Sequence, residues 1–259
     1  MFTVKIDDKE VSVPKGSTIL DAARKAGIWI PTLCYHPAIT SHATCRICMV
    51  ELDRGGWKQL VTACNYPVRK DITVSVTSER AINARKGVME LLLARVPDSK
   101  EIKELAEKMG VMGTPFPTVT ESQRNCILCG LCIRVCEEII GVSAISFAGR
   151  GVDRVVATPF KLASDDCIGC GACAAVCPVG TITLRYHKET EEIEISPFKS
   201  RSPLLTCKKC GKSMVSIPVS VKLFKNLQIN LKEFKKRLEY CPECKRTIAA
   251  ETLCVQAKP

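Results

Sequence analysis

The spacing of the cysteines constrains this chain more than any other feature. Of 259 residues, 17 are cysteine, and most of them stand in C-x-x-C units. This spacing is typical of metal and cluster ligands, whereas a disulfide framework belongs mainly to small secreted domains. The chain opens on the alternating strand pattern MFTVKIDDKEVSV instead of a signal peptide, and its longest apolar stretch is too short to span a membrane. We therefore expect a reduced, cytoplasmic protein that carries metal clusters.

The most specific motif is a repeated run of cysteines with the pattern C-x2-C-x2-C-x3-C. The first run is Cys126, Cys129, Cys132 and Cys136, and the second is Cys167, Cys170, Cys173 and Cys177. Two-residue gaps let neighbouring thiolates reach adjacent irons, and in two-cluster ferredoxins the fourth cysteine of each run ligates the other cluster. The repeat predicts two [4Fe-4S] clusters with crossed ligands, one on Cys126, Cys129, Cys132 and Cys177 and one on Cys167, Cys170, Cys173 and Cys136.

An earlier quartet follows a different spacing. Its members are Cys34, Cys45, Cys48 and Cys64. The segment before them predicts a hairpin over residues 1–13 and a helix over 19–26, which is how a β-grasp ferredoxin domain begins. Plant-type ferredoxins place four residues, not ten, between the first two cysteines. We expect a [2Fe-2S] cluster here, with zinc as the alternative.

The tail carries a further pair of C-x-x-C units. They are Cys207 with Cys210 and Cys241 with Cys244. Two such units make a tetrahedral sulfur site, and structural zinc is the preferred interpretation. The glycine and proline positions also resemble rubredoxin, with its single iron, and an additional iron–sulfur cluster is a third alternative. Cys254 is the odd cysteine, expected to be a buried thiol.

These patterns together predict an α+β protein with distinct modules. We expect a β-grasp [2Fe-2S] ferredoxin domain at 1–78, a helical linker at 79–120 and a bacterial-type 2[4Fe-4S] ferredoxin domain at 121–196. A polar stretch at 196–203 marks a boundary before a four-cysteine zinc-ribbon or rubredoxin-like module at 204–259.

Several segments also resemble a known family. They are IPTLCYHP at 30–37, CRICMVEL at 45–52, CILCGLC at 126–132 and CIGCGAC at 167–173. Residues 1–185 resemble the N-terminal iron–sulfur region of the large complex I subunit and the equivalent small subunit of NAD-linked hydrogenases and formate dehydrogenases. Many members hold another cluster between these modules through one histidine and three cysteines. Residues 79–120 contain neither residue type, so the resemblance implies that this cluster is missing.

The charge of the chain does not require a nucleic-acid partner. The formal charge is +11 with every cysteine counted as neutral, but thiolates of four metal sites would lower it to about +3. Aromatic residues make up only 5% of the chain, which leaves little for stacking on bases.

With no phosphate-binding glycine loop and no acid–base constellation, we expect no substrate site and no binding of NAD or flavin by this chain alone. The predicted function is an electron-transfer subunit between a flavoprotein of NAD(P)H type and a second redox subunit in a hetero-oligomer. The alternatives are a stand-alone ferredoxin carrier and a nucleic-acid-associated protein with structural clusters.

Overall fold

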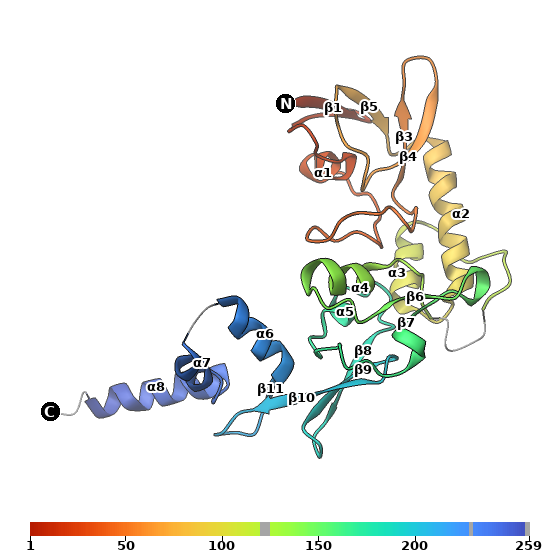
Figure 1. Ribbon diagram of the computed structural model, residues 1–259. Helices are drawn as coiled ribbons and strands as arrows, with labels where there is room; N and C mark the ends of the chain where they lie inside the picture. Colours follow the sequence, from red (N-terminus) through yellow and green to blue (C-terminus); the bar gives the residue numbers. More distant parts are fainter. Residues whose placement is uncertain (120–124, 228–229, 257–259) are drawn as a thin grey trace.

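The computed structural model describes residues 1–119, 125–227 and 230–256 (Figure 1). Figure 1 shows three regions along the chain: a sheet with the N-terminus at one end, a central region of short helices and strands, and a C-terminal arm that projects to one side. Helices α2 (Glu79–Arg95) and α3 (Lys100–Lys108) run between the first two regions.

Residues 1–75 form a mixed sheet and one helix. The elements are β1 (Phe2–Ile6), β2 (Lys9–Val13), α1 (Ile19–Lys25), β3 (Met49–Asp53), β4 (Lys58–Thr62) and β5 (Ile72–Ser75). The strand order is β2-β1-β5-β3-β4, in which only β1 and β5 are parallel. Alternation places Val4, Ile6 and Val50 in a core without exposed surface. The predicted hairpin is present in this sheet.

Local signals in the sequence account for the helix in this region. The Thr18 hydroxyl accepts from the Asp21 backbone N–H at 3.1 Å, and the Asp21 carboxylate accepts from the Thr18 N–H at 2.9 Å. This reciprocal capping box begins α1. Gly27 lies just past its end at φ +66°, a left-handed conformation that glycine adopts without steric cost.

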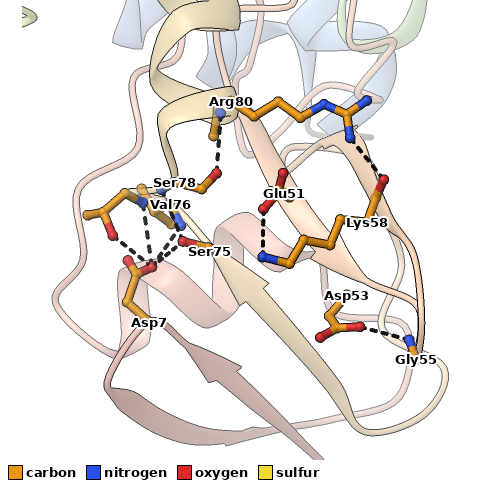
Figure 2. Close-up of polar contacts among 11 residues, drawn as sticks. Asp7, Glu51, Asp53, Gly55, Lys58, Ser75, Val76, Ser78 and Arg80 are labelled. Carbon is orange, nitrogen blue, oxygen red and sulfur yellow. Dashed lines mark hydrogen bonds and ion pairs between the residues drawn. The ribbon is translucent and has the colours of Figure 1, made fainter.

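Polar contacts fix the start of α2 on the sheet (Figure 2). The Asp7 carboxylate accepts from the hydroxyl of Ser75, the last residue of β5, at 2.7 Å. The Ser78 hydroxyl caps α2 by accepting from the Ala81 N–H at 3.2 Å, and the Arg80 guanidinium donates to the Lys58 carbonyl at 3.0 Å. The helix therefore leaves the sheet in a defined direction.

The segment expected to be a linker packs between the first and the central region. Met89 of α2 and Ile102 of α3 are fully buried. They share one hydrophobic cluster with Ile47 from the first region and with Leu131 and Val179 from the second. The two helices fill the space between the regions and bury apolar surface against both.

The central region is built from short elements. They are α4 (Leu131–Arg134), a π-helix (Val135–Ile139), β6 (Ser146–Ala148), a 3₁₀ turn (Gly151–Asp153), β7 (Val155–Ala157), a second 3₁₀ turn (Pro159–Lys161), α5 (Ala172–Ala175), β8 (Thr183–His187) and β9 (Glu192–Ser196). Strands β6 and β7 pair with each other in antiparallel fashion. Both α4 and α5 start directly after a glycine with positive φ, Gly130 and Gly171.

The polar stretch at 196–203 is part of a β-hairpin, with a turn at 197–199 between β9 and the next strand. Strand β10 (Ser200–Thr206) pairs with β9, and the sheet continues in the order β11-β10-β9-β8 with β11 (Ser213–Ser216) at its edge. The tail is thus joined to the central region by a shared sheet. Beyond it lie α6 (Ile217–Leu227), α7 (Leu231–Arg237) and α8 (Pro242–Gln256). Cys254 lies on α8, but its side chain is outside the described residues.

Candidate cluster and metal sites

The structure brings the first quartet of cysteines together beneath the sheet. Cys34 and Cys45 lie on the long loop between α1 and β3, Cys48 directly precedes β3, and Cys64 follows β4. The Cys34 thiol hydrogen-bonds to the thiols of Cys45 and Cys64, and Cys64 also contacts Cys48. The backbone N–H of Cys45 donates to the Cys34 sulfur at 3.4 Å. Cys34 and Cys64 thus each contact two other members of the quartet.

The electrostatics of this quartet favour a bound cation. Hydrogen bonds from the thiols of Cys45 and Cys64 lower the pKa of Cys34 to about 2. The pKa of Cys45 is raised far above its usual range. The hydrogen bond with Cys34 is the largest cause, and burial is the second. Thiols this close cannot all ionise without compensation. A ferric or zinc centre would supply the positive charge that lets all four become thiolates.

The eight cysteines of the repeat surround two separate cavities. One cavity is lined by Cys126, Cys129, Cys132 and Cys177. The other is lined by Cys136, Cys167, Cys170 and Cys173. Each cavity therefore receives three cysteines from one run and the fourth from the other run.

Burial makes these cavities unfavourable for isolated thiolates. Desolvation raises the pKa of Cys129 to about 11 and that of Cys173 to about 12. It raises the pKa of Cys132 further still. Buried sulfur donors of this kind fit a cationic iron–sulfur core, which offsets the cost of removing thiolates from water.

Glycine and serine residues hold the second cavity's ligand loop against the tail sheet. Gly169 has φ +65°, and a Cβ atom placed on it would lie 2.7 Å from Ser202 Cβ and 2.9 Å from Ile193 Cγ2. The Ser202 hydroxyl donates to the Cys167 carbonyl at 3.0 Å, and the Ser200 hydroxyl accepts from the Ser164 N–H at 3.1 Å. Only glycine fits this close approach between the loop and strands β9 and β10.

The four tail cysteines form a compact group. The sulfur atoms of Cys207, Cys210, Cys241 and Cys244 all lie within 4.8 Å of one another, and those of Cys210 and Cys241 are 3.8 Å apart. Four thiolates around one ion at about 2.3 Å form a tetrahedron with edges of about 3.8 Å. The backbone N–H of Cys241 donates to the Cys207 sulfur at 3.3 Å, which lowers the pKa of Cys207 to about 6. The group fits a single tetrahedral ion.

Comparisons with known proteins find iron–sulfur domains in the first two parts of the chain. Residues 1–79 match the family described as the 2Fe-2S iron-sulfur cluster binding domain, and residues 120–184 match the 4Fe-4S dicluster domain. The NADP-reducing hydrogenase subunit HndD of Solidesulfovibrio fructosivorans is 36% identical over 229 residues, which cover 77% of this chain and 39% of that protein. The chain is an iron–sulfur protein homologous to this oxidoreductase subunit.

Other relatives of this iron–sulfur protein point the same way. The NADPH-Fe(3+) oxidoreductase subunit alpha of Geobacter sulfurreducens is 33% identical, with 73% of this chain and 24% of that protein covered. The mitochondrial NADH-ubiquinone oxidoreductase 78 kDa subunit of Candida albicans is 29% identical over 74% of this chain and 31% of that protein. These curated relatives are thus much longer than the segment they share with it. The resemblance to complex I and hydrogenase subunits is confirmed.

A solved structure extends the comparison to the fold. A chain from the crystal structure of NAD+-reducing [NiFe]-hydrogenase in the H2-reduced state aligns with a TM-score of 0.53 at 28% identity. The alignment covers 61% of this iron–sulfur protein and 74% of that chain. Both matched domains end before the tail, so the four-cysteine group at 207–244 lies outside them. Among the described residues, no helix is long and apolar enough to cross a membrane.

The structure also contains functional candidates that the motifs did not indicate. Arg134 is buried between the first two sites, and Ser200 and Ser202 are buried against the loop of the second cavity. An arginine inside a cysteine run, two residues after Cys132, is the one signal that could have drawn attention. The serines carry no such signal because they lie far from the motif in sequence.

Proposed function

We propose that this iron–sulfur protein is an electron-transfer subunit of a multi-subunit oxidoreductase. It would pass single electrons between a flavoprotein of NAD(P)H type and a second redox subunit. The observation that carries this proposal is the arrangement of three cysteine-lined sites on one continuous packed core. Iron–sulfur clusters exchange one electron at a time, and a flavin converts a hydride into single electrons.

We assign a cofactor to each site on its donor geometry. The mutually contacting quartet of Cys34, Cys45, Cys48 and Cys64 would hold the [2Fe-2S] cluster. The two cavities would hold [4Fe-4S] clusters with the crossed fourth ligands Cys177 and Cys136. The matched domain families support both cluster types.

The tail site is assigned to one zinc ion. Its mutual sulfur distances of 4.8 Å or less suit one ion and are too short for thiolates that bind four different irons. A rubredoxin-type iron would occupy the same tetrahedron. Cys210 is exposed, and an exposed thiolate site protects a redox-active iron poorly, which favours zinc. The ion would fix the tail after strand β11.

The partners and location follow from the same reasoning. Hydrogenase and NADPH or NADH oxidoreductase appear in the names of the relatives, and this chain shows no glycine-rich nucleotide loop of its own. A flavoprotein partner would therefore supply the reaction with the pyridine nucleotide. The chain has 17 cysteines, which must stay reduced in order to bind metal. The reducing cytoplasm meets that requirement, so we place the protein there.

The experiment uses the full chain, purified without oxygen. Dithionite should reduce its clusters, whereas NADH and NADPH should not, and adding a flavin-containing partner should restore reduction by the pyridine nucleotide. Dye reduction from NADH by the chain alone would overturn the proposal. Recovery of the native protein as a free monomer would instead favour the stand-alone ferredoxin carrier.

A further inference from the structure

One buried arginine links the ligand loops of two different sites. Arg134, at the end of α4, is only 5% exposed. Its Nη2 atom donates to the Cys34 carbonyl at 3.2 Å and to the Cys129 carbonyl at 3.3 Å. Its Nη1 atom donates to the Thr40 carbonyl. A single nitrogen thus bridges a ligand of the [2Fe-2S] site and a ligand of the first [4Fe-4S] site.

The surrounding structure holds this bridge in place. Gly130 begins α4 with φ +73°, which turns the helix directly after Cys129. One turn beyond Arg134, the Glu138 carboxylate accepts from the Thr40 backbone N–H at 2.8 Å. The same helical segment therefore hydrogen-bonds to the 34–45 loop through both Arg134 and Glu138. Contact between the two regions is made through the ligand loops themselves.

The chemistry of arginine suits this position better than that of lysine. The guanidinium remains protonated at any accessible pH, and its planar fork can donate in several directions at once. Carbonyl acceptors satisfy its N–H groups while leaving its positive charge in place. In a buried position that charge acts over short distances with little screening. It lies between two sites that carry negative charge when their clusters are bound.

We propose that Arg134 is a positioning residue that couples the [2Fe-2S] site to the first [4Fe-4S] site and raises the potentials of both. This inference rests on the proposed cluster assignment. With both clusters bound, an electron that left one cluster would oxidise it and reduce the other. No bond to Arg134 forms or breaks, and the guanidinium keeps its proton. Its charge favours the reduced form of each cluster, and its bridge fixes their spacing.

A matched control is available in Arg95. Its Nε atom donates to the Cys126 carbonyl at 2.9 Å, so it contacts a ligand of the first [4Fe-4S] site. Arg95 makes no described contact with the 34–45 loop. Replacing it removes a positive charge beside one cluster, whereas replacing Arg134 removes a charge shared by two. R95Q and R134Q therefore differ in the number of clusters that should respond.

The test is a redox titration of the full, cluster-loaded chain, followed by paramagnetic resonance. At the wild-type midpoint, R134Q should lower the reduced-to-oxidised ratio of both clusters at least tenfold, which is 59 mV for one electron. R134K, which keeps the charge, should stay within threefold of wild type. R95Q should shift only the first [4Fe-4S] cluster.

Specific results would overturn the inference. One is a reduced-to-oxidised ratio in R134Q that stays within threefold of wild type at either cluster. The other is an equal shift of this ratio at both clusters in R95Q. If R134Q loses iron, the R134K variant becomes the test. A tenfold fall in the reduced-to-oxidised ratios of R134K, which keeps the positive charge, would contradict a role for that charge. A wild-type chain without a [2Fe-2S] signal would instead refute the cluster assignment. No partner is needed, so the result is independent of the oxidoreductase complex.

Discussion

Gly169 offers the sharpest test of how the fold supports a cluster loop. The perturbation is Gly169→Ala, between the proposed ligands Cys167 and Cys170. The new Cβ would lie 2.7 Å from Ser202 Cβ and 2.9 Å from Ile193 Cγ2, so the loop or the sheet must move. Ser202 Cβ and Ile193 Cγ2 lie one and two bonds from their Cα atoms and belong to buried residues, so neither can swing aside.

Two separate costs combine in this variant. A left-handed conformation at a non-glycine residue costs about 1–2 kcal/mol, and overpacking of a filled site costs about 1–3 kcal/mol. Together the two costs destabilise the closed loop relative to an opened loop by about 2–5 kcal/mol. Since 1.4 kcal/mol is about a tenfold change in population, the opened loop should be at least tenfold more populated.

The assay is the release of iron to a chelator from the anaerobic, loaded chain at a fixed urea concentration. Paramagnetic resonance identifies which cluster is lost. Release should follow the population of the open loop, so the second [4Fe-4S] cluster of G169A should disappear at least tenfold faster. The control is G27A, since Gly27 has φ +66° but no atom within 4 Å of an added Cβ.

The reasoning would be refuted by two outcomes. One is release from G169A within twofold of wild type, which would show that the loop absorbs the added methyl group. The other is equal acceleration of the same cluster in G27A, which would assign the effect to backbone strain in general instead of to the contact with Ser202 and Ile193.

Three further predictions address ligation, metal content and pH. Replacing Cys177 with alanine should remove the cluster held by Cys126, Cys129 and Cys132, and replacing Cys136 should remove the one held by the second run; loss of the same-run cluster in either variant, resolved by paramagnetic resonance, would disprove crossed ligation. Elemental analysis of the anaerobic chain should find about ten irons and one zinc, and about eleven irons without zinc would place a rubredoxin-type iron in the tail. Burial opposes ionisation of Glu194, yet hydrogen bonds from Arg201 and His187 outweigh it and lower the pKa of this carboxyl. Its stabilising contribution should therefore be complete above about pH 5 and fall as pH drops through the folded pKa, so E194Q should be less stable than wild type at pH 7 in urea unfolding and the difference should narrow below about pH 4.

Local signals predicted much of the fold because each element carries its own boundary residues. Thr18 and Asp21 mark the start of α1, and alternation from Phe2 to Val13 marks the first hairpin. Strand β10 lacked such a signal. Its inward-facing residues include Ser200 and Ser202, which are buried because their hydroxyls contact the ligand loop. A buried polar face looks like a loop in a hydropathy pattern, so this stretch was expected to be a boundary.

The cysteine motifs placed the candidate ligands but not the groups that hold their loops. Three of those groups share one chemical feature: each donates to the backbone carbonyl of a candidate ligand, as Arg134 does at Cys34 and Cys129, Arg95 at Cys126 and Ser202 at Cys167. Donation to a carbonyl orients the loop while leaving the sulfur free to bind metal. The donors come from α2, α4 and strand β10, so contacts that assemble the fold converge on the loops that carry the candidate ligands. Spacing in sequence contains no information about such contacts, because the bridge from Arg134 to Cys34 joins residues 100 positions apart.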